Sequence, residues 1–427
     1  MIRFDGVTFR YFEDADPVLC DVNVEIPAGE LALLLGATGS GKTTFLRAIN
    51  GLVPHFTGGH LTGSVSVNGR STRENHPREL ADLVGFVPQD PVSGFVTDLV
   101  EDELAYSMEC LGIEPPVMRR RVEEILDLLS LSELRGRPIH TLSGGQQQRV
   151  AIGSVLTAAP EVLVLDEPTS ALDPGAAEEV LAALHRLVHD LGITVVLAEH
   201  RLERVMQYCD SILLLEKGVI TAGLPSELMQ TSPIAPPVIH LGRLAGWDPL
   251  PISIRDARRA APPLQALLAH HSPGLHVVPS QQVKVTQVKN VHSSYGNMPV
   301  LKGIDLDLDA GEITALMGRN GAGKSTLLRT LVGLKDPTKG SVHINGVDPR
   351  SLPARELLHF VGFVPQEPHD LFEALSVATE CKASDSDAGC APGTTRALLA
   401  LMAPDVHDNT HPRDLSEGQQ MLLALCL

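Results

Sequence analysis

The chain has 427 residues, which is enough for two or three domains with substantial cores. Hydrophobic residues make up 43% and charged residues 20%, a balance typical of folded globular proteins rather than disordered ones. The formal net charge of −18 disfavours a nonspecific nucleic-acid binder, because such proteins present basic surfaces, and we expect no nucleic-acid partner. No apolar stretch reaches the roughly 18 residues that a membrane-spanning helix needs, so any membrane role requires a partner.

The first predicted elements are strands. Residues 7–11 and 22–26 alternate apolar and polar side chains, the pattern of half-buried antiparallel strands. Residues 31–35 are apolar without interruption, which suits a central parallel strand covered on both faces. A helix over 178–190 and a strand over 194–198 come later, so strands and helices alternate as in an α/β domain with a parallel sheet.

A phosphate-binding loop directly follows the first apolar run. The sequence Gly36-Ala37-Thr38-Gly39-Ser40-Gly41-Lys42-Thr43 matches the pattern G-x-x-x-x-G-K-[ST]. Glycines allow the backbone to wrap around phosphates, and the N-terminus of the next helix adds a positive dipole. We expect Lys42 to reach the β- and γ-phosphates of a nucleoside triphosphate and Thr43 to ligate Mg²⁺. Further contacts are expected from Gly36, Gly39, Ser40, Gly41 and Thr44.

Two carboxylates follow a second apolar run, residues 162–165. Ligand sites of open α/β sheets lie at the carboxyl ends of strands, which is where Asp166 and Glu167 would stand. We expect Asp166 to hold Mg²⁺ and Glu167 to orient or deprotonate an attacking water. The alternative is an ordinary acidic turn between a strand and a loop.

The strand patterns, the apolar run before the first loop and the phosphate loop have counterparts later in the chain, in the same order. Strand-like alternation returns at 283–286 and 304–309, and an apolar run at 313–317 precedes a second phosphate loop that ends in Lys324 and Ser325. The order is that of a duplicated domain rather than a short repeat. Between the copies lies a proline-rich segment, within which Ser253 begins a capping-box pattern that predicts a short helix. We therefore divide the chain into a first domain, a linker and a second domain: 1–229, 230–280 and 281–427.

The first copy resembles the ATP-binding cassette (ABC) ATPases over its whole length, so the expected fold is a tandem of P-loop NTPase domains. Each would have a central parallel sheet, an antiparallel β subdomain and a helical subdomain. The resemblance makes Tyr11 the aromatic that stacks on adenine, Gln89 a residue that touches magnesium and reports to a membrane partner, and His200 the switch histidine near the γ-phosphate. Residues 142–146 match the family signature, in which Ser143 and Gly145 contact the ATP of a partner cassette. Tyr11 and His200 have ordinary structural alternatives, as a strand aromatic and a strand-end histidine.

The second copy carries part of this set. The matching positions are Tyr295, Gly318, Gly321, Gly323, Lys324, Ser325, Thr326, Gln366, Ser416 and Gly418. Counterparts of Asp166, Glu167 and His200 would fall beyond Leu427, so we expect this copy to be incomplete, natively or because the record is incomplete. We also expect the second half to be unstable or partly disordered, because a core strand would be missing.

The resemblance implies a cassette dimer, formed within one chain or between two chains, with two ATP sites shared between the cassettes. One would combine the first copy's loop and carboxylates with Ser416 and Gly418, and it would be competent for hydrolysis. The other would combine Lys324 and Ser325, the latter a Mg²⁺ ligand, with the first copy's signature; it would bind ATP weakly without hydrolysing it. The cofactors implied are ATP and Mg²⁺.

Within the ABC ATPases, the first copy resembles the energy-coupling factor type, which drives uptake of vitamins and metal ions. The resemblance rests on residues 51–56, on 89–91 with 95–105, and on 199–202. It implies a transmembrane coupling subunit, a substrate-binding membrane subunit and a place at the cytoplasmic face of the cell membrane. Phe95, Val100 and Leu104 are candidate docking contacts, or else core residues of a helix. Two further alternatives are a soluble tandem ABC protein that acts on ribosomes or nucleic acid, and a nonfunctional remnant.

Overall fold

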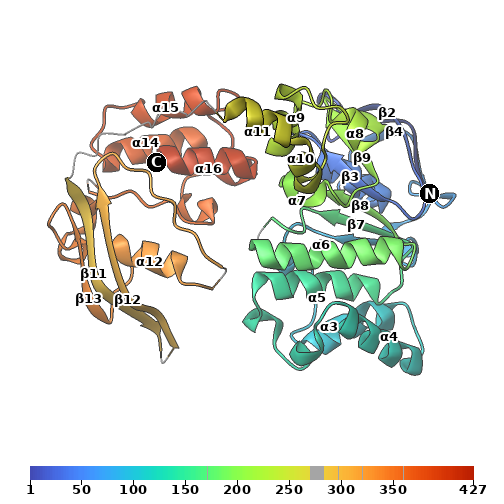
Figure 1. Cartoon of the computed structure of the whole chain (residues 1–427), viewed down its shortest axis with the longest axis horizontal. Helices are drawn as coiled ribbons and strands as arrows, with labels where there is room; N and C mark the ends of the chain where they lie inside the picture. Colours follow the sequence, from blue (N-terminus) through green and yellow to red (C-terminus); the bar gives the residue numbers. More distant parts are fainter. Residues whose placement is uncertain (171, 270–282, 297, 320, 359) are drawn as a thin grey trace. The chain divides into compact units, whose positions relative to one another are not determined.

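The computed structural model describes residues 1–170, 172–269, 283–296, 298–319, 321–358 and 360–427. It divides into two compact units, Met1–Pro273 and Gly274–Leu427 (Figure 1). Within the described residues, no helix is both long enough and apolar enough to cross a bilayer.

The first unit begins with an antiparallel sheet of four strands in the order β2-β1-β4-β5. The strands are β1 (Ile2–Arg10), β2 (Leu19–Ile26), β4 (His60–Val67) and β5 (Arg70–Ser71). Alternate side chains of β1 and β2 are buried, which confirms strands at the two predicted places. Tyr11 lies just past the end of β1.

A six-stranded sheet forms the centre of this unit, in the order β10-β9-β3-β8-β7-β6. Its strands are β3 (Leu31–Leu35), β6 (Val84–Val87), β7 (Val162–Asp166), β8 (Thr194–Ala198), β9 (Ser211–Glu216) and β10 (Val219–Gly223). All neighbours are parallel except β9 and β10. Every residue of β3, β7 and β8 is buried. This confirms the buried strand predicted from the apolar run 31–35, and β8 confirms the predicted strand at 194–198.

Helices cover this sheet in layers (Figure 1). The helix α6 (Pro174–His189) contacts β8 and α5 (Gly144–Leu156), and α3 (Val100–Cys110) and α4 (Pro115–Leu128) pack on α5. The α/β fold predicted from the sequence is confirmed for this unit. The remaining helices are α1 (Lys42–Ile49), α2 (Leu52–His55), α7 (Leu202–Val205), α8 (Pro225–Leu228), α9 (Pro237–Leu244), α10 (Ile254–Ala260) and α11 (Pro262–Leu268).

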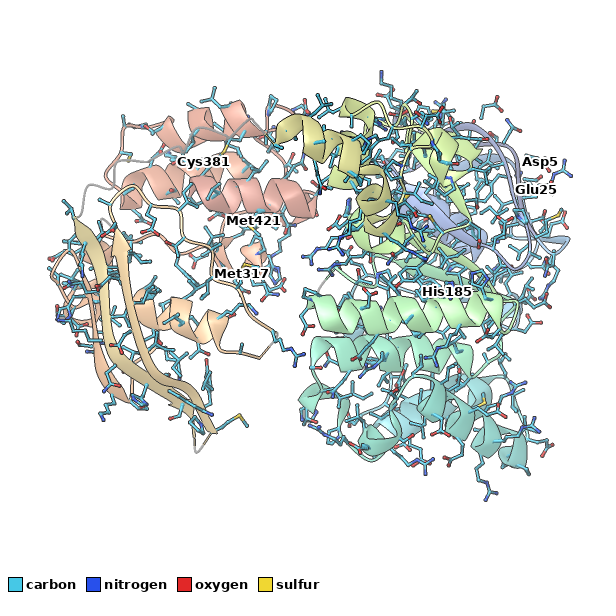
Figure 2. The ribbon with its side chains drawn as sticks, viewed as in Figure 1. Asp5, Glu25, His185, Met317, Cys381 and Met421 are labelled. Atoms are coloured by element: carbon cyan, nitrogen blue, oxygen red, sulfur yellow. The ribbon has the colours of Figure 1, made fainter. Side chains whose placement is uncertain are left out.

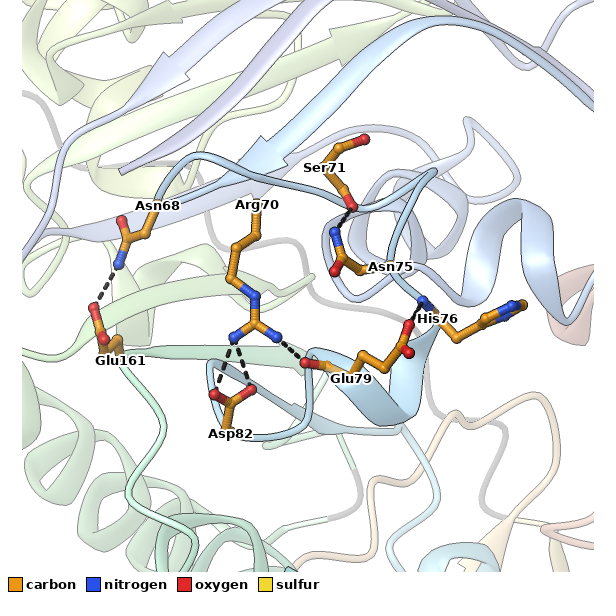
Figure 3. Close-up of polar contacts among 8 residues, drawn as sticks. All are labelled: Asn68, Arg70, Ser71, Asn75, His76, Glu79, Asp82 and Glu161. Carbon is orange, nitrogen blue, oxygen red and sulfur yellow. Dashed lines mark hydrogen bonds and ion pairs between the residues drawn. The ribbon is translucent and has the colours of Figure 1, made fainter.

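Polar contacts tie the antiparallel sheet to the central sheet (Figure 3). Arg70 at β5 donates two hydrogen bonds of 2.9 Å to the carboxylate of Asp82, which lies just before β6. Asn68 donates from its Nδ2 to Glu161, which directly precedes β7. Because both anchors lie beside parallel strands, they fix the β subdomain to the sheet that carries the phosphate loop.

The proline-rich segment contains helices α9, α10 and α11. Ile239 and Leu250 are buried in the main core of the first unit, so α9 and the residues after it pack on that unit. The hydroxyl of Ser253 accepts the backbone N–H of Asp256 at 3.1 Å and caps α10, which confirms the predicted helix start.

The second unit has a three-stranded antiparallel sheet in the order β12-β11-β13. The strands are β11 (Lys284–Tyr295), β12 (Met298–Asp309) and β13 (Lys339–Ile344). Its helices are α12 (Lys324–Leu331), α13 (Ala354–Leu357), α14 (Val377–Asp387), α15 (Thr394–Met402) and α16 (Glu417–Cys426). One small core lies on the sheet around Val291, and another lies among α14, α15 and α16 around Leu399.

The predicted strand at 313–317 is wrong. These residues have no regular secondary structure, and the side chains of Ile313 and Met317 are 100% and 86% exposed (Met317 is labelled in Figure 2). In the first unit, the corresponding strand β3 is hydrogen-bonded to β8 on one side and β9 on the other. No strand within the described part of the second unit pairs with 313–317, and a lone apolar run cannot satisfy its backbone as a strand.

Candidate active site

The phosphate loop joins β3 to α1. Its glycines occupy positions where a side chain would clash with neighbouring atoms or would strain the backbone. A Cβ at Gly36 would lie 2.5 Å from Ser40 Oγ and 2.9 Å from the carbonyl oxygen of Leu215. Gly41 has φ +103° and would place a Cβ 2.6 Å from Val18 Cγ1, whereas Gly39 has φ +77° with open space around it. The loop therefore excludes side chains at two positions by crowding and at two by backbone conformation.

Lys42 and Ser40 make this loop suitable for an anion. The Lys42 side chain is 6% exposed, and its Nζ donates to the carbonyl oxygens of Gly36 at 2.9 Å and Ala37 at 3.2 Å. Burial lowers the pKa of Lys42, and the nearby carboxylates of Glu167 and Asp166 oppose that shift. Ser40 Oγ is buried and has no hydrogen-bond partner among the described residues. The loop thus carries a cation, held by the loop's own carbonyl oxygens, and a buried hydroxyl without a hydrogen-bond partner among the described residues.

Asp166 ends β7 beside Thr43. Its carboxylate is buried, and burial raises its pKa, while a hydrogen bond with the Thr43 side chain acts in the opposite direction. Both side chains offer oxygen atoms, the ligand type that Mg²⁺ prefers. No group of three or more His, Cys, Asp or Glu residues suited to a metal occurs in the described ranges. A magnesium ion here would therefore need phosphate oxygens to complete its shell, and the residues fit that arrangement.

The Glu167 side chain contacts the two other predicted catalytic side chains, those of His200 and Gln89. Its backbone is in the left-handed region, with φ +49°, and its N–H donates to the carbonyl of Ala198 at 3.0 Å. Its carboxylate lies 2.8 Å from His200 Nε2, and it accepts a bond of 3.4 Å from Gln89 Nε2. The three residues follow the ends of β7, β8 and β6, so the parallel sheet brings them to one edge.

Tyr11 is placed close to the phosphate loop by the end of β1. Its hydroxyl is 2.7 Å from Thr44 Oγ1, and its ring meets Phe9 edge-on with centroids 4.9 Å apart. The ring is partly exposed. In the second unit, a side-chain hydrogen bond with Thr326 and the nearby Lys335 help to lower the pKa of Tyr295. Lys335 Nζ lies over the Tyr295 ring at 3.8 Å from its centroid.

The signature residues form the N-terminus of helix α5. Ser143 N–H donates to Gln146 Oε1 at 3.0 Å, and Ser143 Oγ accepts Gln146 N–H at 3.4 Å, a capping box at the start of α5. Sequence reasoning assigned no role to Gln146, although the S-x-x-Q spacing signals the cap. Gly145 is buried, and a Cβ there would lie 2.7 Å from the Cβ of Ala176 in α6. This glycine allows α5 and α6 to approach closely.

The second unit repeats the local geometry of these motifs. Lys324 Nζ donates to the carbonyl oxygens of Gly318 at 2.8 Å and Arg319 at 2.9 Å. Ser416 caps α16 in the same reciprocal way, with Gln419. Gly321 and Gly323 have positive φ. Ser325, Gln366 and Gly418 are exposed, and Thr326 is buried. The assembly of Ser416 and Gly418 with the first loop stays a prediction.

Two of the three candidate docking residues are core residues instead. Val100 and Leu104 are fully buried in the main core, and Phe95 packs against it. The reason is that α3 turns its apolar face toward α5, and both side chains lie on that face. The exposed apolar side chains in this region are Val92, Val96, Leu99 and Tyr106.

Sequence reasoning gave no role to Glu199, which follows β8. This side chain is 2% exposed and accepts backbone hydrogen bonds from Thr169 at 2.8 Å and His200 at 3.2 Å. The signal available in the sequence was a carboxylate immediately beside His200.

Comparisons with known proteins show the family to which the chain belongs. The ABC transporter family profile matches residues 19–170 and 301–427. A putative ABC transporter ATP-binding protein of Streptomyces avermitilis is 57% identical over all of this chain and 81% of its own length. Another, from Methanosarcina mazei, is 33% identical over all of this chain and 77% of its own length.

A solved structure resembles the chain as well. It is cbiO1 from Clostridium perfringens, described as part of the ABC transporter complex cbiONQ, with 26% identity and a TM-score of 0.52. The match covers 63% of this chain and 98% of cbiO1. The family profile, the relatives and the phosphate loop agree that this chain belongs to the ABC transporter family, as an ATP-binding protein with an ATP-hydrolysing cassette.

Proposed function

We propose that this chain is the ATPase subunit of an energy-coupling factor type importer for a vitamin or a metal ion. The observation that carries the catalytic part is the Glu167 carboxylate, which contacts both His200 and Gln89 beside the phosphate loop. Support for the transporter type comes from cbiO1, which is described as part of an ABC transporter complex.

The residues divide the chemical work of hydrolysis. Lys42 and the loop backbone bind the β- and γ-phosphates, and Tyr11 stacks on adenine. Glu167 orients a water molecule and takes up its proton, and His200 and Gln89 hold that carboxylate in place. Thr43 and Asp166, with Gln89 nearby, would hold Mg²⁺, which neutralises charge on the phosphates when bound.

The signature of one cassette completes the ATP site of the other in this proposal. Ser416 and Gly418 would serve the loop that carries Lys42. The N-terminus of α16, which Ser416 caps, would add a positive dipole near the γ-phosphate. Tyr295, Lys324, Ser325 and Gln366 would pair with Ser143 and Gly145 in a second site. The described residues of the second unit include no Asp-Glu pair at the end of a buried strand like Asp166-Glu167.

The docking surface for a membrane subunit would lie next to Gln89. Val92, Val96 and Leu99 expose their side chains on the segment between Gln89 and α3, and Tyr106 does so on α3 itself. Exposed apolar side chains in one segment are typical of a protein contact. A coupling subunit bound here would move the segment that begins with Gln89, and thereby the carboxylate of Glu167. The transporter role places the chain at the cytoplasmic face of the membrane.

The catalytic part is tested by steady-state ATP hydrolysis of the full chain and of Glu167→Gln. We expect the variant to bind ATP like the wild type and to lose turnover by about 10²–10⁴-fold, the usual size of a general-base effect. Equal rates for the two proteins would rule out catalysis at this site.

The docking part is tested with Val96→Glu. Val219→Glu is the matched control, because Val219 is also an exposed valine but lies on β10, outside the proposed docking surface. Expressed in its source cells, the wild type and the control should co-purify with integral membrane proteins from detergent-solubilised membranes, and Val96→Glu should not. Salt-sensitive sedimentation of the wild type with ribosomes, and none with membranes, would favour the soluble alternative.

A further inference from the structure

Glu199 is a buried carboxylate placed between two catalytic segments. It follows β8, and its neighbour in sequence is His200. Its Oε1 accepts the backbone N–H of Thr169 at 2.8 Å, and its Oε2 accepts the backbone N–H of His200 at 3.2 Å. One side chain therefore holds the segment after Glu167 and the segment that presents the histidine.

The segment after β7 has few other anchors to β8. Glu167 N–H donates to the carbonyl of Ala198 at 3.0 Å, and Ser170 folds back onto the Glu167 carbonyl through its N–H and its hydroxyl. Thr169 is the next point at which this turn meets the residues following β8. Without Glu199, the turn that carries Glu167 would be attached to β8 at its first residue alone among the contacts described.

Burial of this carboxylate is costly, which argues for a specific role. Burial raises the pKa of Glu199, its hydrogen bonds with Thr169 and His200 oppose that shift, and the like charge of Glu167 adds to it. A buried anion close to another carboxylate is unfavourable unless its hydrogen bonds hold it. An apolar residue would fill the same space without that cost, but it could not accept either amide.

We propose that Glu199 is a positioning residue for ATP hydrolysis, which fixes the distance between Glu167 and His200 by binding the backbone on both sides. The inference rests on the proposed roles of those two residues. Catalytic groups displaced by about 1 Å can lose on the order of 10²-fold in rate, so a brace of two hydrogen bonds has a measurable effect.

The test is Glu199→Gln in the full chain. The amide keeps the shape and one acceptor, but its NH₂ group must face one of the two backbone N–H donors. We expect kcat to fall by about 10–100-fold while KM for ATP changes by less than about threefold, because the loss is confined to the transition state. A kcat within about twofold of the wild type, or a loss that appears only in KM, would overturn the proposal.

Glu380→Gln is the matched control. Glu380 in α14 is also buried and accepts two backbone amides, from Glu373 at 3.1 Å and Ala374 at 2.7 Å. The same chemical change there should lower thermal stability without a selective loss of kcat. An equal loss of kcat in the two variants would mean that Glu199 acts through general stability, and the proposal would be wrong.

Two further measurements keep the outcome clear. Glu199→Asp keeps the charge but is one methylene too short to reach both amides, so it should fold and lose kcat by an intermediate factor; full kcat would contradict the proposal. Amide exchange in peptides containing Thr169 and His200 should accelerate in both variants.

Glu167→Gln separates the hypothesis about the catalytic site from the hypothesis about Glu199. If it turns over like the wild type, the proposed catalytic site fails, whereas a dead Glu167→Gln with a fully active Glu199→Gln removes only the role of Glu199.

Discussion

The two phosphate loops of this chain have nearly the same local geometry, but the residues that precede them differ in secondary structure. Lys42 and Lys324 both reach back to the two carbonyl oxygens that begin their loops, at 2.9 and 3.2 Å and at 2.8 and 2.9 Å. A helix starts at each lysine. The strand that precedes the first loop is the centre of a six-stranded sheet, whereas the residues that precede the second form no strand.

This difference shows that a short sequence is enough to determine the conformation of the loop, whereas formation of the preceding strand depends on neighbouring strands and helices. Glycines and the following helix are enough to shape a phosphate loop. A central parallel strand needs hydrogen-bonding partners on both sides and apolar cover on both faces. The first unit supplies both for Leu31–Leu35, and the described second unit supplies neither for 313–317.

The largest contrast should appear in Leu35→Ala and Met317→Ala, which occupy equivalent places before the two loops. Leu35 is fully buried, so its truncation should reduce the free energy of unfolding of the first unit by about 2–5 kcal/mol. Met317 is 86% exposed, and its truncation should change stability by less than about 0.5 kcal/mol.

Urea unfolding can measure the first variant by the fluorescence of Trp247, the single tryptophan of the chain, which lies in the first unit. For Met317→Ala, far-UV circular dichroism during urea unfolding measures the stability. A large loss in Met317→Ala would show that this run is buried in the functional protein. The prediction that the second half is unstable or partly disordered is checked with an isolated 281–427 fragment. Cooperative unfolding of this fragment with slow amide exchange would contradict it.

A smaller contrast is expected between Lys42→Ala and Lys324→Ala. Loss of Lys42 removes charged hydrogen bonds to phosphate worth about 1.5–3 kcal/mol, so ATP affinity at the competent site should fall by roughly 10–100-fold. Lys324→Ala should leave the hydrolysis rate within about threefold of the wild type, because the proposed catalytic group Glu167 lies beside the loop of Lys42. ATP titration and steady-state kinetics measure both variants, and comparable rate losses would mean that hydrolysis depends equally on both loops.

The smallest contrast concerns the signature glycines. Gly145→Ala would place a methyl group 2.7 Å from Ala176 Cβ, so it should destabilise the first unit by about 1–3 kcal/mol. Gly418→Ala meets no atom within 4 Å, so the fold of the second unit should tolerate it. Thermal unfolding of the two variants decides the matter. Equal losses would mean that the second signature is also packed against a helix.

Sequence alone predicted the features that depend on local pattern. The phosphate loop, the strands over 31–35 and 194–198 and the place of Asp166 and Glu167 at the end of a buried strand all follow from runs of a few residues. The strand at 313–317 and the docking role of Val100 and Leu104 failed, because burial there depends on distant elements. Glu199 could not be assigned a role, since its partner Thr169 is close only after β7 and β8 pair.

The left-handed backbone of Glu167 has a consequence for engineering. A residue with a Cβ at φ +49° is held at a cost of about 1 kcal/mol, which glycine would avoid. Directed evolution for heat resistance would therefore favour loss of the Glu167 side chain, the group that we propose activates water. Selection for thermostability in this cassette should always be paired with a screen for turnover.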